Sequence, residues 1–183
     1  MHIGHARTFV NFDVIVKFFK FLGFKVRYIR NITDVDDKII NRAKEEGIPA
    51  LDLSKKYIKE MHDDFSSLGI ESPDVEPKVS DHIDEIISMI QSLEEKGYAY
   101  RKKESDVFFD VQKFKEYGKL SNRSLEQLTA AERTIVDLNK KHKADFVLWK
   151  VDTDGITWPS PWGKGRPGWH IECSAMSLSL IHI

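Results

Sequence analysis

The chain has 183 residues and a formal net charge of −1, with 41% hydrophobic and 31% charged residues. This length allows one domain, or one domain that carries an insertion, and the composition is that of an ordinary globular protein. The near-neutral charge excludes a broad cationic surface, so any contact with nucleic acid must come from a local patch or from a part outside this sequence.

The cysteine content and the apolar runs indicate the compartment. Cys173 is the only cysteine, so no disulfide can form within the chain, which fits a reducing environment. The N-terminus lacks the pattern of a secretion signal, and no apolar run approaches the length of a membrane span. We therefore predict a cytoplasmic protein with no membrane partner.

The first half of the chain predicts mainly helices. Apolar residues at spacings of three and four predict a helix over 6–22, ended by Gly23. Because this helix is rich in phenylalanine, we expect it to be buried on more than one side. The segment KVRYIRNIT predicts a buried strand. The further predicted helices are, in chain order, 34–47 ended by Gly47, 51–70, and 80–97 capped by Ser80 and ended by Gly97.

The second half is richer in loops and short strands. SDVFFDV and DFVLWKV predict strands, WPSPWGKGRPG predicts a loop, and WHIECSAMSLSLI predicts a helix. The change in character predicts a domain interrupted by a subdomain. Its first part covers residues 1–97, the insertion covers 98–146, and its second part covers 147–183.

Two histidines, His2 and His5, bracket Gly4 where the first predicted helix begins. Helix N-termini expose unpaired N–H groups and the positive end of the helix dipole, so they suit phosphates. Glycine lets a ligand approach the backbone, and imidazoles can donate hydrogen bonds to phosphoryl oxygens. Taken alone, two histidines at this spacing are also typical of solvent-exposed side chains or of a weak metal pair.

Several motifs in order make the chain resemble a known family. HIGHARTFVNFDV, RNITDVDDKII, DFVLWK and WPSPWGKGRPGWHIECSAM are similar to the catalytic domain of cysteinyl-tRNA synthetases, which are class I aminoacyl-tRNA synthetases. The similarity runs from His2 to about Met176. It implies a partial, Rossmann-like α/β catalytic domain with an inserted subdomain. It also implies a ligase of protein biosynthesis that uses ATP, with Mg²⁺, to activate L-cysteine as cysteinyl-adenylate and then transfers it to tRNA(Cys).

The resemblance also implies roles for individual residues. His2, Gly4 and His5 would bind ATP, with His2 and His5 acting catalytically at the reacting phosphates. Thr33 and Trp169 would shape the cysteine pocket. Alternatives stay open at both of these positions. Thr33 can cap the following helix together with Asp36, and Trp169 can be a buried core residue.

Cys173 has three interpretations. It can be a small buried hydrophobe, or a nucleophile paired with His170 one helical turn earlier. By resemblance, it is instead a ligand of a zinc ion that also holds the substrate thiol, because zinc favours thiolate. Trp169 lies four residues before Cys173, so both can face one pocket.

A zinc site needs three protein ligands when the substrate is the fourth, and this sequence supplies one. The family's other ligands are an upstream cysteine and the histidine and glutamate of a HHENE-type segment, and none is present. The lysine-rich KMSKS signature and an anticodon-binding region are also absent. We therefore expect a fragment of a larger enzyme that is inactive alone.

Gly163, Gly165 and Gly168 match the dinucleotide fingerprint G-x-G-x-x-G. A long Trp/Pro loop separates them from the preceding strand, and Pro167 lies inside the motif, so NAD binding is not expected. We expect these glycines to let a loop fold tightly against a substrate.

Two charged clusters have ordinary explanations. Asp34, Asp36 and Asp37 suggest a magnesium site, but acidic residues in the first turn of a helix are explained by its dipole. The basic run 139–143 is a weak candidate for tRNA contact, because such runs are usually solvated.

Two other functions stay open at this stage. One is the related ligase of mycothiol synthesis, which activates cysteine but joins it to an amino sugar. RNITDVDDKII and the full GWHIECSAM favour the synthetase over this ligase. The other is a truncated product or interaction module that keeps the fold without activity.

Overall fold

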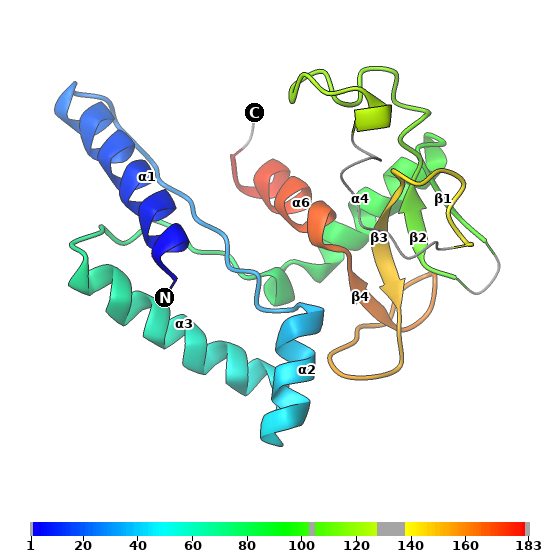
Figure 1. Cartoon of the computed structure of the whole chain (residues 1–183), viewed down its shortest axis with the longest axis horizontal. Coiled ribbons are helices and arrows are strands. Elements are labelled where there is room, and N and C mark those ends of the chain that lie inside the picture. Colours follow the sequence, from blue (N-terminus) through cyan, green and yellow to red (C-terminus); the bar gives the residue numbers. More distant parts are fainter. Residues whose placement is uncertain (1, 103–104, 128–137, 182–183) are drawn as a thin grey trace. The chain divides into compact units, whose positions relative to one another are not determined.

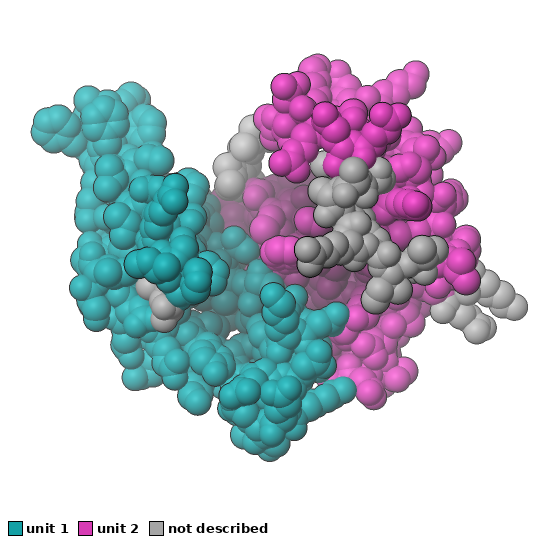
Figure 2. Space-filling view, in the orientation of Figure 1, with its two compact units in different colours: residues 1–81 teal, residues 82–183 magenta. Residues whose placement is uncertain are grey.

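A computed structural model describes residues 2–102, 105–127 and 138–181. The chain forms two compact units, residues 1–81 and residues 82–183, which Figure 2 distinguishes by colour. The division at residues 97 and 146 that the sequence suggests stays a prediction.

The first unit contains three α-helices and one short 3₁₀ turn (Figure 1). The predicted helices are confirmed, with shifts of a few residues at their ends. Gly47 ends the second helix with a φ of 67°, a backbone conformation that glycine adopts without strain. The helices are α1 (Ile3–Phe21), α2 (Asp37–Glu46) and α3 (Ala50–Ser67), and the 3₁₀ turn is Val79–Asp81.

The strand predicted from KVRYIRNIT is reduced to two isolated parallel bridges. Ile29 pairs with Val75, and Ile32 pairs with Lys78. The backbone N–H of Ile32 donates to the carbonyl of Pro77 over 2.8 Å. The segment is therefore extended and pairs along one side with residues 75–78. Within the described residues it is not part of a larger sheet.

Two predicted helix caps are wrong. Ser80 does not cap the fourth helix, because its Oγ and its backbone N–H both donate to the carboxylate of Asp34, over 2.5 Å and 3.1 Å. Thr33 does not cap α2, because Asp36 occupies that position and accepts from the N–H of Lys38 over 2.8 Å. Asp34 and Asp36 thus have structural roles, but that of Asp34 is the bond to Ser80 and not the interaction with the helix dipole that the sequence suggested.

The expectation that α1 is buried on more than one side is wrong. Only Asp13 and Val16 of this helix are buried, and most of its phenylalanines are exposed. The helix carries apolar side chains on all of its faces, but the rest of the first unit packs against only one narrow stripe of it. The apolar periodicity predicted the helix correctly but not the number of its partners.

In the part of the second unit that the structure describes, helices α4 and α6 pack with a four-stranded antiparallel sheet, in the order β1–β2–β3–β4. Helix α4 packs against α6, and the two helices contact the sheet at β1 and β3 respectively (Figure 1). The predicted strands β2 and β3 are confirmed, and β1 was missed. The elements are α4 (Ile83–Glu95), β1 (Ala99–Arg101), β2 (Val107–Phe109), β3 (Phe146–Val151), β4 (Gly165–Pro167) and α6 (Trp169–Ile181).

Strand β4 lies where the sequence predicted a loop, and it explains two of the three fingerprint glycines. A Cβ on Gly165 would overlap the carbonyl of Lys150, and one on Gly168 would overlap the carbonyl of Val147. These glycines therefore let the chain approach β3, and not a substrate as the sequence suggested. Pro167 is tolerated because β4 is an edge strand, which needs fewer backbone donors.

The core of the second unit lies between its helices and its sheet. Ile86 and Ile90 of α4, together with Phe108, Leu148 and Trp149 of the sheet, are almost completely buried. In the part of the chain that the structure describes, no helix is long and apolar enough to span a bilayer.

Candidate functional site

The N-terminus of α1 is capped by the first residue of the HIGH motif. The Nδ1 atom of His2 accepts a hydrogen bond from the backbone N–H of Gly4 over 3.1 Å. The carbonyl of His2 also accepts from the N–H groups of His5 and Ala6, over 2.9 Å and 3.1 Å. With Nδ1 used as an acceptor, the neutral ring carries its proton on Nε2, which leaves that atom as a donor.

Gly4 is not required by the backbone. Its φ is not in the left-handed region, and a Cβ there would meet only the His2 ring, at 3.1 Å from Nδ1 and 3.3 Å from Cε1. The His5 ring stands edge-on to the His2 ring, with the two centroids 5.8 Å apart. Both histidines are exposed. The turn therefore presents two imidazoles to solvent, and Gly4 places no side chain over the backbone, an arrangement suited to an anionic ligand.

Thr33 is half-buried in the segment that joins the two parallel bridges to α2. It lies next to Asp34, which is 3% exposed and is held by Ser80. The backbone on its C-terminal side is therefore fixed by a buried carboxylate. Sequence reasoning attributed this carboxylate to the helix dipole and missed its link to Ser80.

Trp169 and Cys173 begin α6, and both are exposed, Trp169 to 70%. They lie four residues apart on one side of the helix, as their spacing predicted. The alternatives of a buried core tryptophan and a small buried cysteine are therefore wrong. A tryptophan side chain this exposed is uncommon in a folded protein, and where one occurs it often belongs to a binding surface.

Of the neighbouring residues on α6, Ile171 and Glu172 are buried, whereas His170 is exposed and contacts two aromatic rings. Glu172 is 1% exposed. The His170 ring stacks on Trp169 at 5.7 Å and stands edge-on to Phe146 at 5.1 Å. His170 also lines a cavity of about 710 Å³ between α4, the sheet and α6. The sequence showed neither this cavity nor the aromatic contacts of His170.

The basic run 139–143 is tied to the sheet. The backbone N–H of Lys141 donates to the Tyr100 hydroxyl over 2.6 Å, and its ammonium lies 4.0 Å from the centre of that ring. Burial, together with the hydrogen bond to Asp145, raises the pKa of Tyr100 above its ordinary value. Lys141 therefore has a structural role, and a contact of this run with tRNA stays a prediction.

The described residues do not form a complete zinc site. Within residues 2–102, 105–127 and 138–181, no three His, Cys, Asp or Glu side chains are grouped to hold a metal ion. Cys173 offers one thiolate, whereas a zinc site that leaves a position for substrate needs three protein ligands. The residues present therefore do not by themselves fit the metal.

The predicted site residues are divided between the two units. His2, Gly4, His5 and Thr33 belong to the first unit, and within it the HIGH residues form one turn. Trp169 and Cys173 belong to the second and share one helix face. Each group is positioned by its own unit.

Comparison with known proteins assigns the family. The family described as tRNA synthetases class I (C) catalytic domain matches residues 1–182. A cysteine–tRNA ligase from Idiomarina loihiensis is 55% identical over 177 residues, which is 96% of this chain and 39% of that protein.

Two further relatives have the same printed name. One from Vibrio atlanticus is 51% identical over 181 residues, and one from Pasteurella multocida is 55% identical over 177 residues. The alignment with the Vibrio atlanticus protein includes 98% of this chain, and the alignment with the Pasteurella multocida protein includes 96%. Each alignment spans 39% of the relative's own length. The chain belongs to the catalytic-domain family of the class I tRNA synthetases of the cysteine type.

Proposed function

We propose that this chain is part of an enzyme that activates L-cysteine with ATP and transfers it to tRNA(Cys). The family match across residues 1–182 carries this proposal. The exposed HIGH turn and the exposed Trp169–Cys173 face support it, because both present polar or aromatic groups to solvent.

In the first step, a carboxylate oxygen of cysteine attacks the α-phosphorus of ATP. A new oxygen–phosphorus bond forms, and pyrophosphate leaves with the electrons of the bond that breaks. Charge accumulates on the phosphoryl oxygens, so fixed donors stabilise the transition state. The Nε2–H of His2 and the ring of His5 are the donors we assign to this task, and the N–H of Gly4 can join them once it is released from the His2 ring. Gly4 leaves room for the nucleotide, which brings Mg²⁺ with it.

In the second step, a ribose hydroxyl at the 3′ end of tRNA attacks the carbonyl carbon of the adenylate, and AMP leaves. Positioning of the two reactants supplies most of the rate gain in such transfers. We assign Thr33 and Trp169 each to binding of the cysteine moiety.

Cys173 is proposed as one thiolate ligand of zinc, with the other ligands supplied by segments outside this chain. Such an ion would bind the substrate sulfur and reject serine, which shape alone rejects poorly. The described residues do not complete the site, and the two steps above depend on this chain's own residues. We also propose that the whole catalytic domain contains a Rossmann-like parallel sheet, to which the bridges of Ile29 and Ile32 would belong. A cytoplasmic location is proposed as well.

A second candidate is that the 183-residue chain keeps its fold but has no activity alone. The incomplete metal site and the 39% coverage of its relatives favour this candidate. The mycothiol ligase has no such observation in its favour, because the relatives named above are all cysteine–tRNA ligases.

The test is cysteine-dependent exchange between ATP and labelled pyrophosphate. It compares the 183-residue chain with a chimera in which this chain replaces the 177 aligned residues of the Idiomarina loihiensis relative. We expect exchange by the chimera with cysteine and not with serine, and none by the chain alone. A folded chimera without exchange would overturn the proposed function, and equal exchange with serine would overturn the role of Cys173.

A further inference from the structure

Helix α1 is held in its unit by one narrow stripe of side chains. Ala6 and Phe9 are half-buried and Asp13 and Val16 are buried, whereas the other faces of the helix are exposed. The spacing of these residues places them on one face of the helix. His2 lies four residues before Ala6, so the contacts of this stripe determine where the HIGH turn points.

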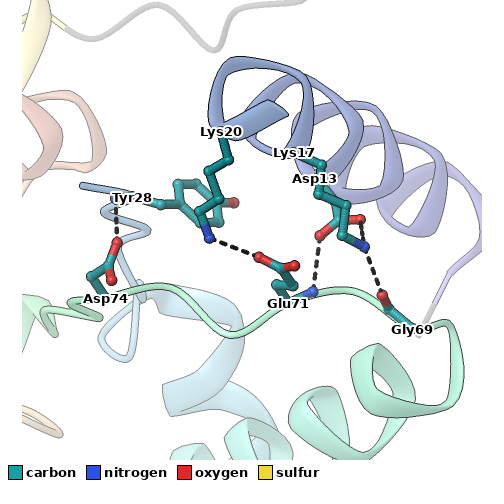
Figure 3. A network of polar contacts seen from close by, with 7 residues as sticks. All are labelled: Asp13, Lys17, Lys20, Tyr28, Gly69, Glu71 and Asp74. Atoms are coloured by element: carbon teal, nitrogen blue, oxygen red, sulfur yellow. Dashed lines mark hydrogen bonds and ion pairs between the residues drawn. The ribbon is translucent and has the colours of Figure 1, made fainter. Parts of the chain in front are cut away.

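The C-terminal half of the stripe is anchored by polar contacts (Figure 3). Asp13 accepts from the backbone N–H of Glu71 over 2.9 Å and from the ammonium of Lys17 over 2.6 Å. Lys17 also donates to the carbonyl of Gly69, and Lys20 pairs with Glu71 at 2.8 Å. These contacts join two turns of α1 to the segment that follows α3.

The N-terminal half of the stripe is anchored by Phe9 and a buried arginine. The Phe9 ring stands edge-on to Phe65 of α3, with the centroids 4.8 Å apart. The guanidinium carbon of Arg30 lies 4.4 Å from the centre of Phe65 and 5.5 Å from that of Phe9. Among the large side chains of α1 that contact the rest of the unit, Phe9 thus lies nearest to the HIGH turn.

Arg30 is fixed from the other side by Glu76. Its Nε and Nη2 atoms both donate to one carboxylate oxygen of Glu76, over 2.8 Å and 2.6 Å. The second oxygen of Glu76 bonds to Nε2 of His62 over 2.5 Å. The side chain of Arg30 is 7% exposed, so the charge is held away from water with its partner in place.

The ion pair alone does not explain an arginine here. Within the described residues, Nη1 of Arg30 is buried and has no hydrogen-bond partner. An unpaired buried donor is unfavourable. The planar guanidinium contacts two ring faces, which a lysine ammonium cannot do in the same way.

We propose that Arg30 is a positioning residue for the HIGH turn, acting through Phe9. Held by Glu76 against Phe65, it presents a flat cationic surface to the Phe9 ring and thereby sets the first turns of α1. The importance of that turn in catalysis rests on the proposed function, but the positioning itself does not.

The experiment uses the whole 183-residue chain labelled with ¹⁵N, without nucleotide. Arg30→Lys keeps the charge, and Phe9→Leu keeps an apolar side chain on the helix. Phe12→Leu is the control for Phe9, because Phe12 lies on the same helix and is 51% exposed. Arg42→Lys is the control for Arg30, because Arg42 is ion-paired to Glu46 on an exposed helix surface. Amide exchange is measured by NMR at His5 and Ala6, and at Ala43 as a distant reference.

We expect Phe9→Leu and Arg30→Lys each to speed exchange at His5 and Ala6 about tenfold, as loss of a partly buried cation–π contact implies. The double variant should add little to either single change, and exchange at Ala43 and in both controls should stay the same. Unchanged exchange at His5 and Ala6 in folded Arg30→Lys would overturn the proposal, as would equal acceleration at Ala43. If Arg30→Lys does not fold, Phe9→Leu decides by the same criteria. Because no ATP is present, the result is independent of whether the protein activates cysteine.

Discussion

The imidazole of His2 accepts a hydrogen bond from the backbone N–H of Gly4, and the two residues close the first turn of α1 on itself. The bond occupies one of the backbone N–H groups at the start of the helix. A phosphate that takes this donor must displace the His2 ring, which then becomes available as a second donor. The same two residues can thus stabilise the helix when the turn is empty and bind an anion when it is filled.

Substitution of Gly4 should separate folding from ligand binding. Gly4→Ala places a methyl group against the His2 ring only, and alanine is favoured in a helix by about 1 kcal/mol. We expect the unfolding free energy of the chain to be unchanged or slightly raised in urea titrations. Exchange of pyrophosphate by the chimera should fall at least about 100-fold. A Gly4→Ala chimera of full activity would contradict the assignment of this turn to ATP.

Two substitutions of His2 should separate its cap from its chemistry. His2→Ala removes the cap and should cost about 1 kcal/mol of unfolding free energy. His2→Asn supplies a new capping side chain and should recover most of that stability. Neither variant retains the Nε2–H donor, so both chimeras should lose pyrophosphate exchange. Activity that follows stability, with Asn restoring both, would mean that His2 acts only as a cap.

Replacement of Cys173 should affect selectivity and leave the fold intact. Its side chain is exposed, so Cys173→Ser should change the unfolding free energy by less than about 0.5 kcal/mol. In the chimera, the KM for cysteine should rise by about tenfold or more, as loss of a metal ligand implies. Zinc content measured on the same samples provides the independent readout. An unchanged KM together with an unchanged zinc content would exclude the ligand role.

Asp13 should make the first unit sensitive to acid. Burial raises the pKa of this carboxyl, but the hydrogen bonds from Lys17 and from the N–H of Glu71 outweigh it and leave the pKa below its ordinary value. The ionised group therefore stabilises the fold at neutral pH, and this contribution is lost as the pH falls below about 4 and through the folded-state pKa. Asp13→Asn should lower the unfolding free energy at pH 7 by about 1–2 kcal/mol.

The difference between wild type and Asp13→Asn should shrink between pH 5 and pH 3, in urea titrations at each pH. The control is Asp52→Asn, because Asp52 is exposed and its lysine partner lies in solvent. A difference that stays constant down to pH 3 would show that the charge of Asp13 contributes nothing.

Gly168 should tolerate no side chain. A Cβ there would overlap the carbonyl of Val147, and the N–H of Gly168 donates to the carbonyl of Leu148 over 2.8 Å. Gly168→Ala should therefore cost about 2–3 kcal/mol through displacement of β4 from β3. The same substitution at Gly4 is the matched control. Equal melting temperatures for the two variants would contradict the close approach of β4 to β3.

Short sequence patterns predicted the ends of helices correctly where the residue at that position has a single physical role. Gly47 ends α2 because glycine adopts a positive φ without strain, and this could be predicted from its place after a periodic segment. Ser80 and Asp34 show the opposite case. A serine before a helix is a common cap, but a buried carboxylate 46 residues earlier in the chain binds it instead. No local pattern contains that partner.

The sequence motifs predicted which residues belong to the candidate site, but not which of their side chains are exposed or what they contact. The position of His2 before α1 followed from the motif, whereas the hydrogen bond from Gly4 to its ring did not. The spacing of Trp169 and Cys173 predicted a shared helix face, but spacing cannot distinguish an exposed face from a buried one. The fingerprint glycines were assigned to a substrate because the edge strand β4, which begins at Gly165 and ends just before Gly168, was not expected.

The contacts within the first unit also set an order of events during synthesis. Tyr28 binds Asp74 and Asp34 binds Ser80, so the last residues of the unit complete contacts with segments made much earlier. Chains are synthesised from the N-terminus at a limited rate, and their domains fold as they emerge. Until about residue 80 has left the ribosome, the extended segment before α2 lacks its partner and α1 lacks its anchor at Glu71. A nascent chain shorter than this therefore lacks the contacts at Glu71, Asp74 and Ser80 that hold the folded first unit together.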